Sequence, residues 1–142
     1  MTAKAYFNRI KALMDNCDSL KHQVEELNAD LTAIGGFDYS KPIVQTSPRN
    51  TTEDKILKLY DLISQYTDAI ESCQAEIMAA ESKLVCLSRP EYAKVIRLRF
   101  FGKKGKIALW GWVAEELGYS EGRTKHIFSE AMNEFEKLFL KS

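Results

Sequence analysis

Residues 120–129 carry side chains that can contact the edges of DNA bases. Spacings of three and four place Thr124, Ile127 and Ala131 on one face of a helix. The other positions form an outward polar face, made up of Ser120, Glu121, Gly122, Lys125, His126 and Ser129. Their hydroxyl, carboxylate, ammonium and imidazole groups suit base contacts in a major groove. We therefore expect a recognition helix here.

The residues just before this stretch predict a turn between two helices. Gly118 can adopt the left-handed conformation that ends a helix, and the Ser120 hydroxyl can cap the next one. Val113, Ala114 and Leu117 share one face of the preceding helix. The pattern indicates a helix-turn-helix, although an ordinary helical hairpin with Gly118 as its C-cap has the same spacing.

Phosphate contacts are expected from Arg123 and from the basic loop of residues 102–106, Gly-Lys-Lys-Gly-Lys. Lys103, Lys104 and Lys106 would bind the DNA backbone, with a merely solvated loop as the alternative. The loop lacks the glycine spacing and the Lys-Ser/Thr ending of a nucleotide-binding P-loop. Trp110 and Trp112 follow it, either as core residues or as platforms for bases.

Charge is unevenly distributed along the 142 residues, although the formal net charge is zero. Residues 1–88 carry a net charge of −4, residues 89–126 carry +5, and residues 127–142 carry −1. The positive segment contains the basic loop and the predicted turn. Such a segment can neutralise phosphates and release counterions, so salt-dependent DNA binding is expected.

Other classes of function have little support in the sequence. It has no paired carboxylates, no nucleophile with a base and no metal-ligand cluster, so we expect no enzyme, cofactor or metal. The three cysteines, Cys17, Cys73 and Cys86, are too far apart for a zinc ribbon or a redox pair. No apolar run of about 18 residues and no secretion signal is present, so we expect a cytoplasmic protein without membrane contact.

Two heptad seams predict long helices that fold back on each other. The first seam is Ala3, Tyr6, Ile10, Leu13, Cys17, Leu20, Val24, Leu27, Leu31 and Ile34. The second is Ile56, Leu59, Ile63, Tyr66, Ile70, Cys73, Ile77, Ala80, Leu84 and Leu87. Together they predict an antiparallel coiled-coil hairpin. Each seam is narrow, so Met14, Tyr60 and Leu62 should remain partly exposed, and self-association is expected.

Breaks in the pattern define the predicted domains. Gly35-Gly36 ends the first helix, and a polar loop of residues 35–50 follows it. Pro90 ends the second helix and starts a helix to Phe101, with Lys94, Arg97 and Arg99 exposed. We expect an all-α protein: a long antiparallel coiled-coil helical hairpin over 1–88, then a small three-helix helix-turn-helix domain over 89–142. Met132, Phe135, Leu138 and Phe139 would close its core.

The second domain resembles region 4 of bacterial sigma factors, which reads the −35 promoter element. Residues 95–100, Val-Ile-Arg-Leu-Arg-Phe, resemble the helix before that family's motif, and residues 113–120, Val-Ala-Glu-Glu-Leu-Gly-Tyr-Ser, resemble its first helix and turn. The whole chain resembles a family of phage and prophage proteins of Gram-positive bacteria, which have a long hairpin before such a domain. The loop segments 38–41 and 44–48 carry this second resemblance.

The resemblance implies a sigma-like transcriptional regulator that binds double-stranded DNA. The hairpin would then oligomerise the protein or contact RNA polymerase. One alternative is a DNA-packaging subunit of the small-terminase type, which also combines DNA-binding helices with a coiled coil. Another is a protein-docking module whose basic face meets an acidic partner without touching DNA.

Overall fold

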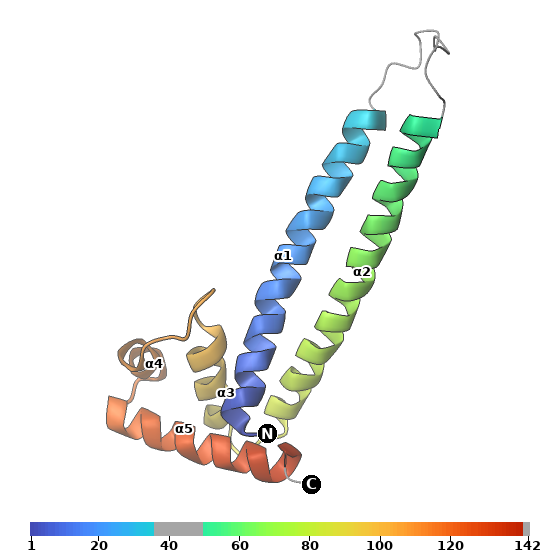
Figure 1. Ribbon diagram of the computed structural model, residues 1–142. Coiled ribbons are helices and arrows are strands. Elements are labelled where there is room, and N and C mark those ends of the chain that lie inside the picture. The colour runs from blue at the N-terminus through green and yellow to red at the C-terminus, as the bar shows by residue number, and fades with distance from the viewer. Residues whose placement is uncertain (36–49, 141–142) are drawn as a thin grey trace. The chain divides into compact units, whose positions relative to one another are not determined.

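The computed structural model describes residues 1–35 and 50–140, and every regular element in these ranges is helical. The elements are α1 (Ala3–Gly35), α2 (Asn50–Val85), α3 (Pro90–Ile96), η1 (Arg97–Phe101), α4 (Trp110–Leu117), α5 (Glu121–Phe135) and η2 (Glu136–Leu140), where η marks a π-helix (Figure 1). The all-α prediction is confirmed. No helix within these ranges is long and apolar enough to cross a membrane. The resemblance-bearing segments 38–41 and 44–48 lie outside the described residues.

The chain divides into two compact units, one of Met1–Asp15 with Gln74–Ser142 and one of Asn16–Cys73. This division differs from the predicted one at 88/89. It falls within α1 and α2, because the first turns of α1 and the last turns of α2 share a core with α3, α4 and α5. The C-terminal helices therefore form a compact unit together with the chain's first fifteen residues.

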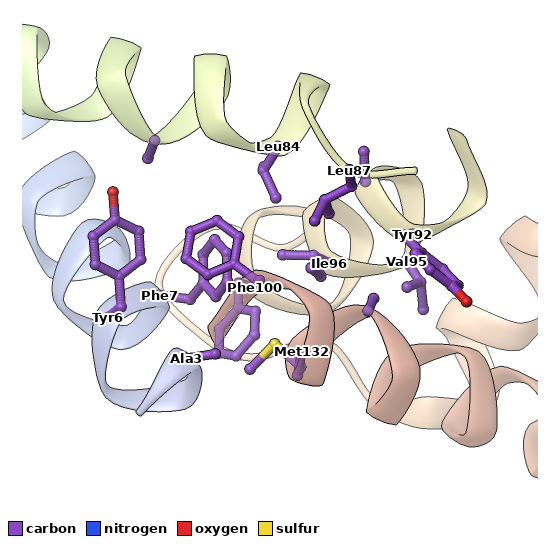
Figure 2. Close-up of a cluster of buried hydrophobic side chains, with 14 of the residues drawn as sticks. Ala3, Tyr6, Phe7, Leu84, Leu87, Tyr92, Val95, Ile96, Phe100 and Met132 are labelled. Atoms are coloured by element: carbon purple, nitrogen blue, oxygen red, sulfur yellow. The ribbon is translucent and has the colours of Figure 1, made fainter. Parts of the chain in front are cut away.

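Phe7 lies at the centre of the core of this first unit and is fully buried. Its ring stacks on Phe100 of η1 at 5.4 Å between centroids and lies 4.6 Å from Phe135 of α5. Figure 2 shows Phe7 and Ala3 of α1 in one cluster with Phe100 and Met132, and with Leu84 at the end of α2. Aromatic burial on this scale is a major source of stability.

α1 and α2 run antiparallel within the first unit, where an ion pair and a cation–π contact join them beside the core. Arg9 forms an ion pair of 3.0 Å with Glu76, and the Lys83 ammonium lies 5.0 Å from the Tyr6 ring centroid. The Arg9–Glu76 pair is half exposed, so it adds little to the stability that the apolar core supplies.

The second unit consists of the remaining turns of α1 and α2, again antiparallel, with Asn16 of one helix donating a 3.9 Å hydrogen bond to the Cys73 sulfur of the other. Cys17 and Cys73 are buried, as expected for seam residues. Every seam residue between them is only half-buried: Leu20, Val24, Leu27, Leu31, Ile34, Ile56, Leu59, Ile63, Tyr66 and Ile70. Tyr60 and Leu62 are exposed, which confirms that prediction.

The π-helix η2 moves a side chain away from the position that α-helical spacing predicts. The hydrogen bonds of a π-turn join residues five apart, so its turn is wider than that of an α-helix. In η1 the wider turn changes little, because Phe100 is buried together with Val95 and Ile96. In η2 the wider turn leaves Leu138 exposed by 53% while Phe139 and Leu140 are half-buried. The prediction that Leu138 closes the core is therefore wrong.

Candidate nucleic-acid interface

The turn between α4 and α5 has the geometry that its residues predict. Gly118 ends α4 with φ of +78°, in the left-handed region, and its N–H donates to the Ala114 carbonyl at 2.9 Å. The Ser120 hydroxyl accepts a 3.3 Å hydrogen bond from the Arg123 N–H, which caps α5. Both predictions are confirmed. The turn holds the first residues of α5 at the surface.

α5 buries one face and leaves the other open. Thr124, Ile127 and Ala131 are buried, and the Thr124 hydroxyl donates to the Ser120 carbonyl at 2.8 Å, so this polar group is satisfied. The outward polar face keeps its expected members together: Ser120, Glu121, Gly122, Lys125, His126 and Ser129 are all exposed. Hydrogen-bonding groups of several kinds are thus presented from one helix.

Arg123 lies beside the turn and is held against an aromatic ring. Its guanidinium lies 4.4 Å from the centroid of Tyr119. The Tyr119 hydroxyl in turn donates a long hydrogen bond of 3.4 Å to Glu91 of α3. Arg123 remains exposed, so its charge is available at the surface.

The basic loop, residues 102–106, packs against α4 through Lys103. The Lys103 ammonium lies 4.4 Å from the centroid of the Trp112 ring, and the residue is half-buried. Lys104 and Lys106 are exposed. The three predicted phosphate ligands therefore differ in setting, since Lys103 is half-buried against a ring while Lys104 and Lys106 are exposed.

Arg99 was predicted to be exposed, but it is half-buried. Its guanidinium lies 4.2 Å from the centroid of Trp110 and donates a hydrogen bond to the Ala108 carbonyl, so it fastens the end of the loop segment. Burial lowers the pKa of Arg99. Arg97 also departs from the prediction, because it is half-buried in an ion pair of 3.0 Å with Glu81.

A cluster of three side chains beside the outward polar face was not predicted. The Tyr92 hydroxyl of α3 donates a 2.8 Å hydrogen bond to Glu130, and Glu130 lies 2.9 Å from Nε2 of His126. The hydrogen bond from Tyr92 lowers the pKa of Glu130, with His126 and Arg89 adding to the effect. The same hydrogen bond raises the pKa of Tyr92. The spacing of four between His126 and Glu130 was the available signal.

Carboxylates accompany the cations on this side of the unit. Glu115, Glu116 and Glu121 are exposed on α4 and the first turn of α5. They oppose phosphate binding close to the turn, whereas a carboxylate on a recognition helix can accept from the amino group of cytosine. Within residues 1–35 and 50–140, no group of three or more His, Cys, Asp or Glu side chains is placed to hold a metal ion.

No family model, curated protein or solved structure matches this chain. The site offers an exposed helix face with mixed hydrogen-bonding groups, a capped turn that fixes this helix, and cations on the adjacent loop and turn.

Proposed function

We propose that the chain is a DNA-binding transcriptional regulator of the phage or prophage type, which inserts α5 into the major groove. In this proposal Lys125, His126 and Ser129 contact base edges, with Ser120, Glu121 and Gly122 at the start of the same helix. Lys103, Lys104, Lys106 and Arg123 bind phosphates. The resemblance to sigma region 4 adds promoter DNA as the target class.

The observation that carries the proposal is the pairing of a buried and an exposed face on α5 behind a capped left-handed turn. Gly118 and Ser120 fix the angle and start of α5, and the buried Thr124, Ile127 and Ala131 anchor it. A recognition helix needs this combination, because base contacts require side chains on a helix that does not shift.

The test is selection of bound duplexes from a randomised library, followed by fluorescence anisotropy on the selected and a scrambled duplex. The variant K125A/H126A should bind both duplexes alike, because the base-contacting groups are gone. The matched control is H22A/K137A, which removes the same two residue types at exposed positions that do not belong to the outward polar face. This control should keep the preference. A K125A/H126A chain that still prefers the selected duplex would refute the base-contact assignment.

We propose further that α1 and α2 of the second unit associate with a second copy of the chain. The supporting observation is that none of residues 18–34 and 52–72 is buried, although two heptad seams run through them. Removing leucine and isoleucine seams of this length from water by covering them with further helices lowers the free energy. A closed dimer is the commonest arrangement that does so.

Light scattering after size exclusion tests this part. A dimer is expected for the wild-type chain, and I63D should shift it to a monomer because it places a charge in the half-buried seam. K58D, a charge change at an exposed position of the same helix, is the control and should leave the dimer intact. A monomeric wild type would contradict the association, and a ring of eight or more subunits would favour the small-terminase class.

A protein-docking module is the second candidate, favoured by the exposed Glu115, Glu116 and Glu121 near the turn. In this case the basic loop would meet an acidic surface of a partner such as RNA polymerase. Absence of binding to any duplex at low salt, together with binding to the polymerase, would favour docking over DNA recognition.

A further inference from the structure

The basic loop is tied to a helix at the opposite end of the sequence. Lys11 of α1 donates a 2.9 Å hydrogen bond from its ammonium to the carbonyl of Lys103, across 92 residues of chain. Both residues are half-buried and belong to the same compact unit. A hydrogen bond from a charged donor to a carbonyl is among the stronger ones, and partial burial shields it from water.

Three further contacts surround this tie. The Gly102 N–H donates to the Leu98 carbonyl at 3.2 Å, and the Trp112 ring lies against Gly102. After the loop, the Ala108 N–H donates to the Arg99 carbonyl at 3.0 Å. The backbone is thus held on both sides of Lys104 and Lys106, with Lys11 on the Lys104 side and the Ala108–Arg99 hydrogen bond on the Lys106 side.

We propose that Lys11 is a positioning residue for phosphate binding, which sets the direction of Lys104 and Lys106 before DNA arrives. The inference rests on the proposed function and adds a residue from α1 to it. Its ammonium points into the loop backbone, so Lys11 itself touches no phosphate. A loop ordered in advance loses less conformational entropy on binding, and more of its contact energy then appears as affinity.

The test compares two lysine variants of the full chain, K11M and K4M, on one selected duplex across a salt series. Lys4 lies on the same helix and is exposed, so both variants lose one charge. K11M should weaken binding about tenfold, because Lys104 and Lys106 are then no longer ordered in advance and their phosphate contacts are lost. It should also flatten the slope of log K against log salt by about one to two, roughly one per lost phosphate contact. K4M should change neither quantity, and K11R should restore both.

A double-mutant cycle separates positioning from a general loss of structure. K104A/K106A should weaken DNA binding strongly in the wild-type background and only slightly in the K11M background, because K11M has already lost the contribution of these two side chains. Circular dichroism of each variant reports folding, and K11R carries the test if K11M unfolds. Equal behaviour of K11M and K4M, or full additivity in the cycle, overturns the role of Lys11 while DNA binding stands. A wild-type chain that binds no duplex overturns the proposed function and this inference with it.

Discussion

The Tyr92 hydroxyl donates a 2.8 Å hydrogen bond to the carboxylate of Glu130 and so links α3 to the exposed side of α5. Tyr92 is buried, and Glu130 also approaches His126 on the outward polar face. The carboxylate thus ties a side chain proposed to contact bases to a residue of the buried core. The consequences of this relationship can be measured through pH.

Y92F should destabilise the chain in a pH-dependent way. The pKa of Glu130 is lowered in the folded state, so its bond to Tyr92 contributes stability above the ordinary glutamate range, and this contribution is lost as pH falls through the folded pKa. The pKa of Tyr92 is raised, so the contribution is complete below the ordinary tyrosine range and is lost as pH rises through the folded value. The stability difference between wild type and Y92F, measured by urea unfolding, should be constant near neutral pH and shrink at both extremes.

The control for this pH profile is Y60F, because Tyr60 is exposed on α2 and is not a member of the cluster. Y60F should cost little at any pH. A Y92F difference that stays the same at low pH would show that the bond to Glu130 adds no stability and that only packing has changed.

F7A should destabilise the first unit by about 3 to 5 kcal/mol, the usual cost of removing a fully buried phenylalanine. Phe7 contacts rings of η1 and α5, so its loss should also weaken DNA binding, although it lies on α1. Urea unfolding followed by the fluorescence of Trp110 and Trp112 measures the effect, because both tryptophans pack against this core. L27A, in the half-buried seam of the second unit, should shift this signal much less. Equal shifts would mean that the two units unfold together.

G118A and G122A should act in opposite directions. Gly118 has φ of +78°, where an alanine is strained, so G118A should cost about 1 to 2 kcal/mol. Gly122 lies within α5 with open space where a Cβ would be, so G122A should stabilise by up to about 1 kcal/mol. Thermal unfolding of the two variants beside wild type decides. A stabilised G118A would contradict the left-handed turn on which the orientation of α5 depends.

Local features of this chain could be predicted from the sequence because neighbouring residues determine them. The helices, the Gly118 turn, the Ser120 cap and the two faces of α5 all follow from spacing and propensity. The sequence does not show which element covers an apolar face. The first seam identifies a face of α1 but says nothing about the C-terminal helices that also cover its first turns, and Phe7 lies outside the seam altogether.

The side chains around the basic loop illustrate the same limit. A lysine or an arginine on an amphipathic helix is expected in solvent, whereas Lys11 and Arg99 both donate to backbone carbonyls of the loop segment. These bonds join positions that come together only after folding, so no local spacing indicates them. The π-helix η2 also departs from the expected period of 3.6, and Leu138 lies at the surface there.

G102A tests how closely the loop is fitted to α4. Gly102 has an ordinary right-handed φ of −72°, so an added methyl group causes no backbone strain. Its Cβ would lie 2.5 Å from the Leu98 carbonyl oxygen and 2.6 Å from the Trp112 ring, and real contacts of a Cβ are essentially never this short. The oxygen is backbone and cannot rotate aside, so η1 or the loop must move, at a typical overpacking cost of about 1 to 3 kcal/mol.

Movement of the loop should have two further effects, since the Trp112 ring also supports Lys103. The tryptophan emission of folded G102A should change. Its DNA affinity should also fall at a temperature where the variant is fully folded, so that lost stability is not the cause. G111A is the matched control, because Gly111 directly precedes Trp112 in the sequence and has open space where a Cβ would be. G111A should keep both the emission and the affinity. A G102A chain with unchanged emission would mean that the basic loop does not rest against Trp112, and the proposed ordering of Lys104 and Lys106 would then lack its support on α4.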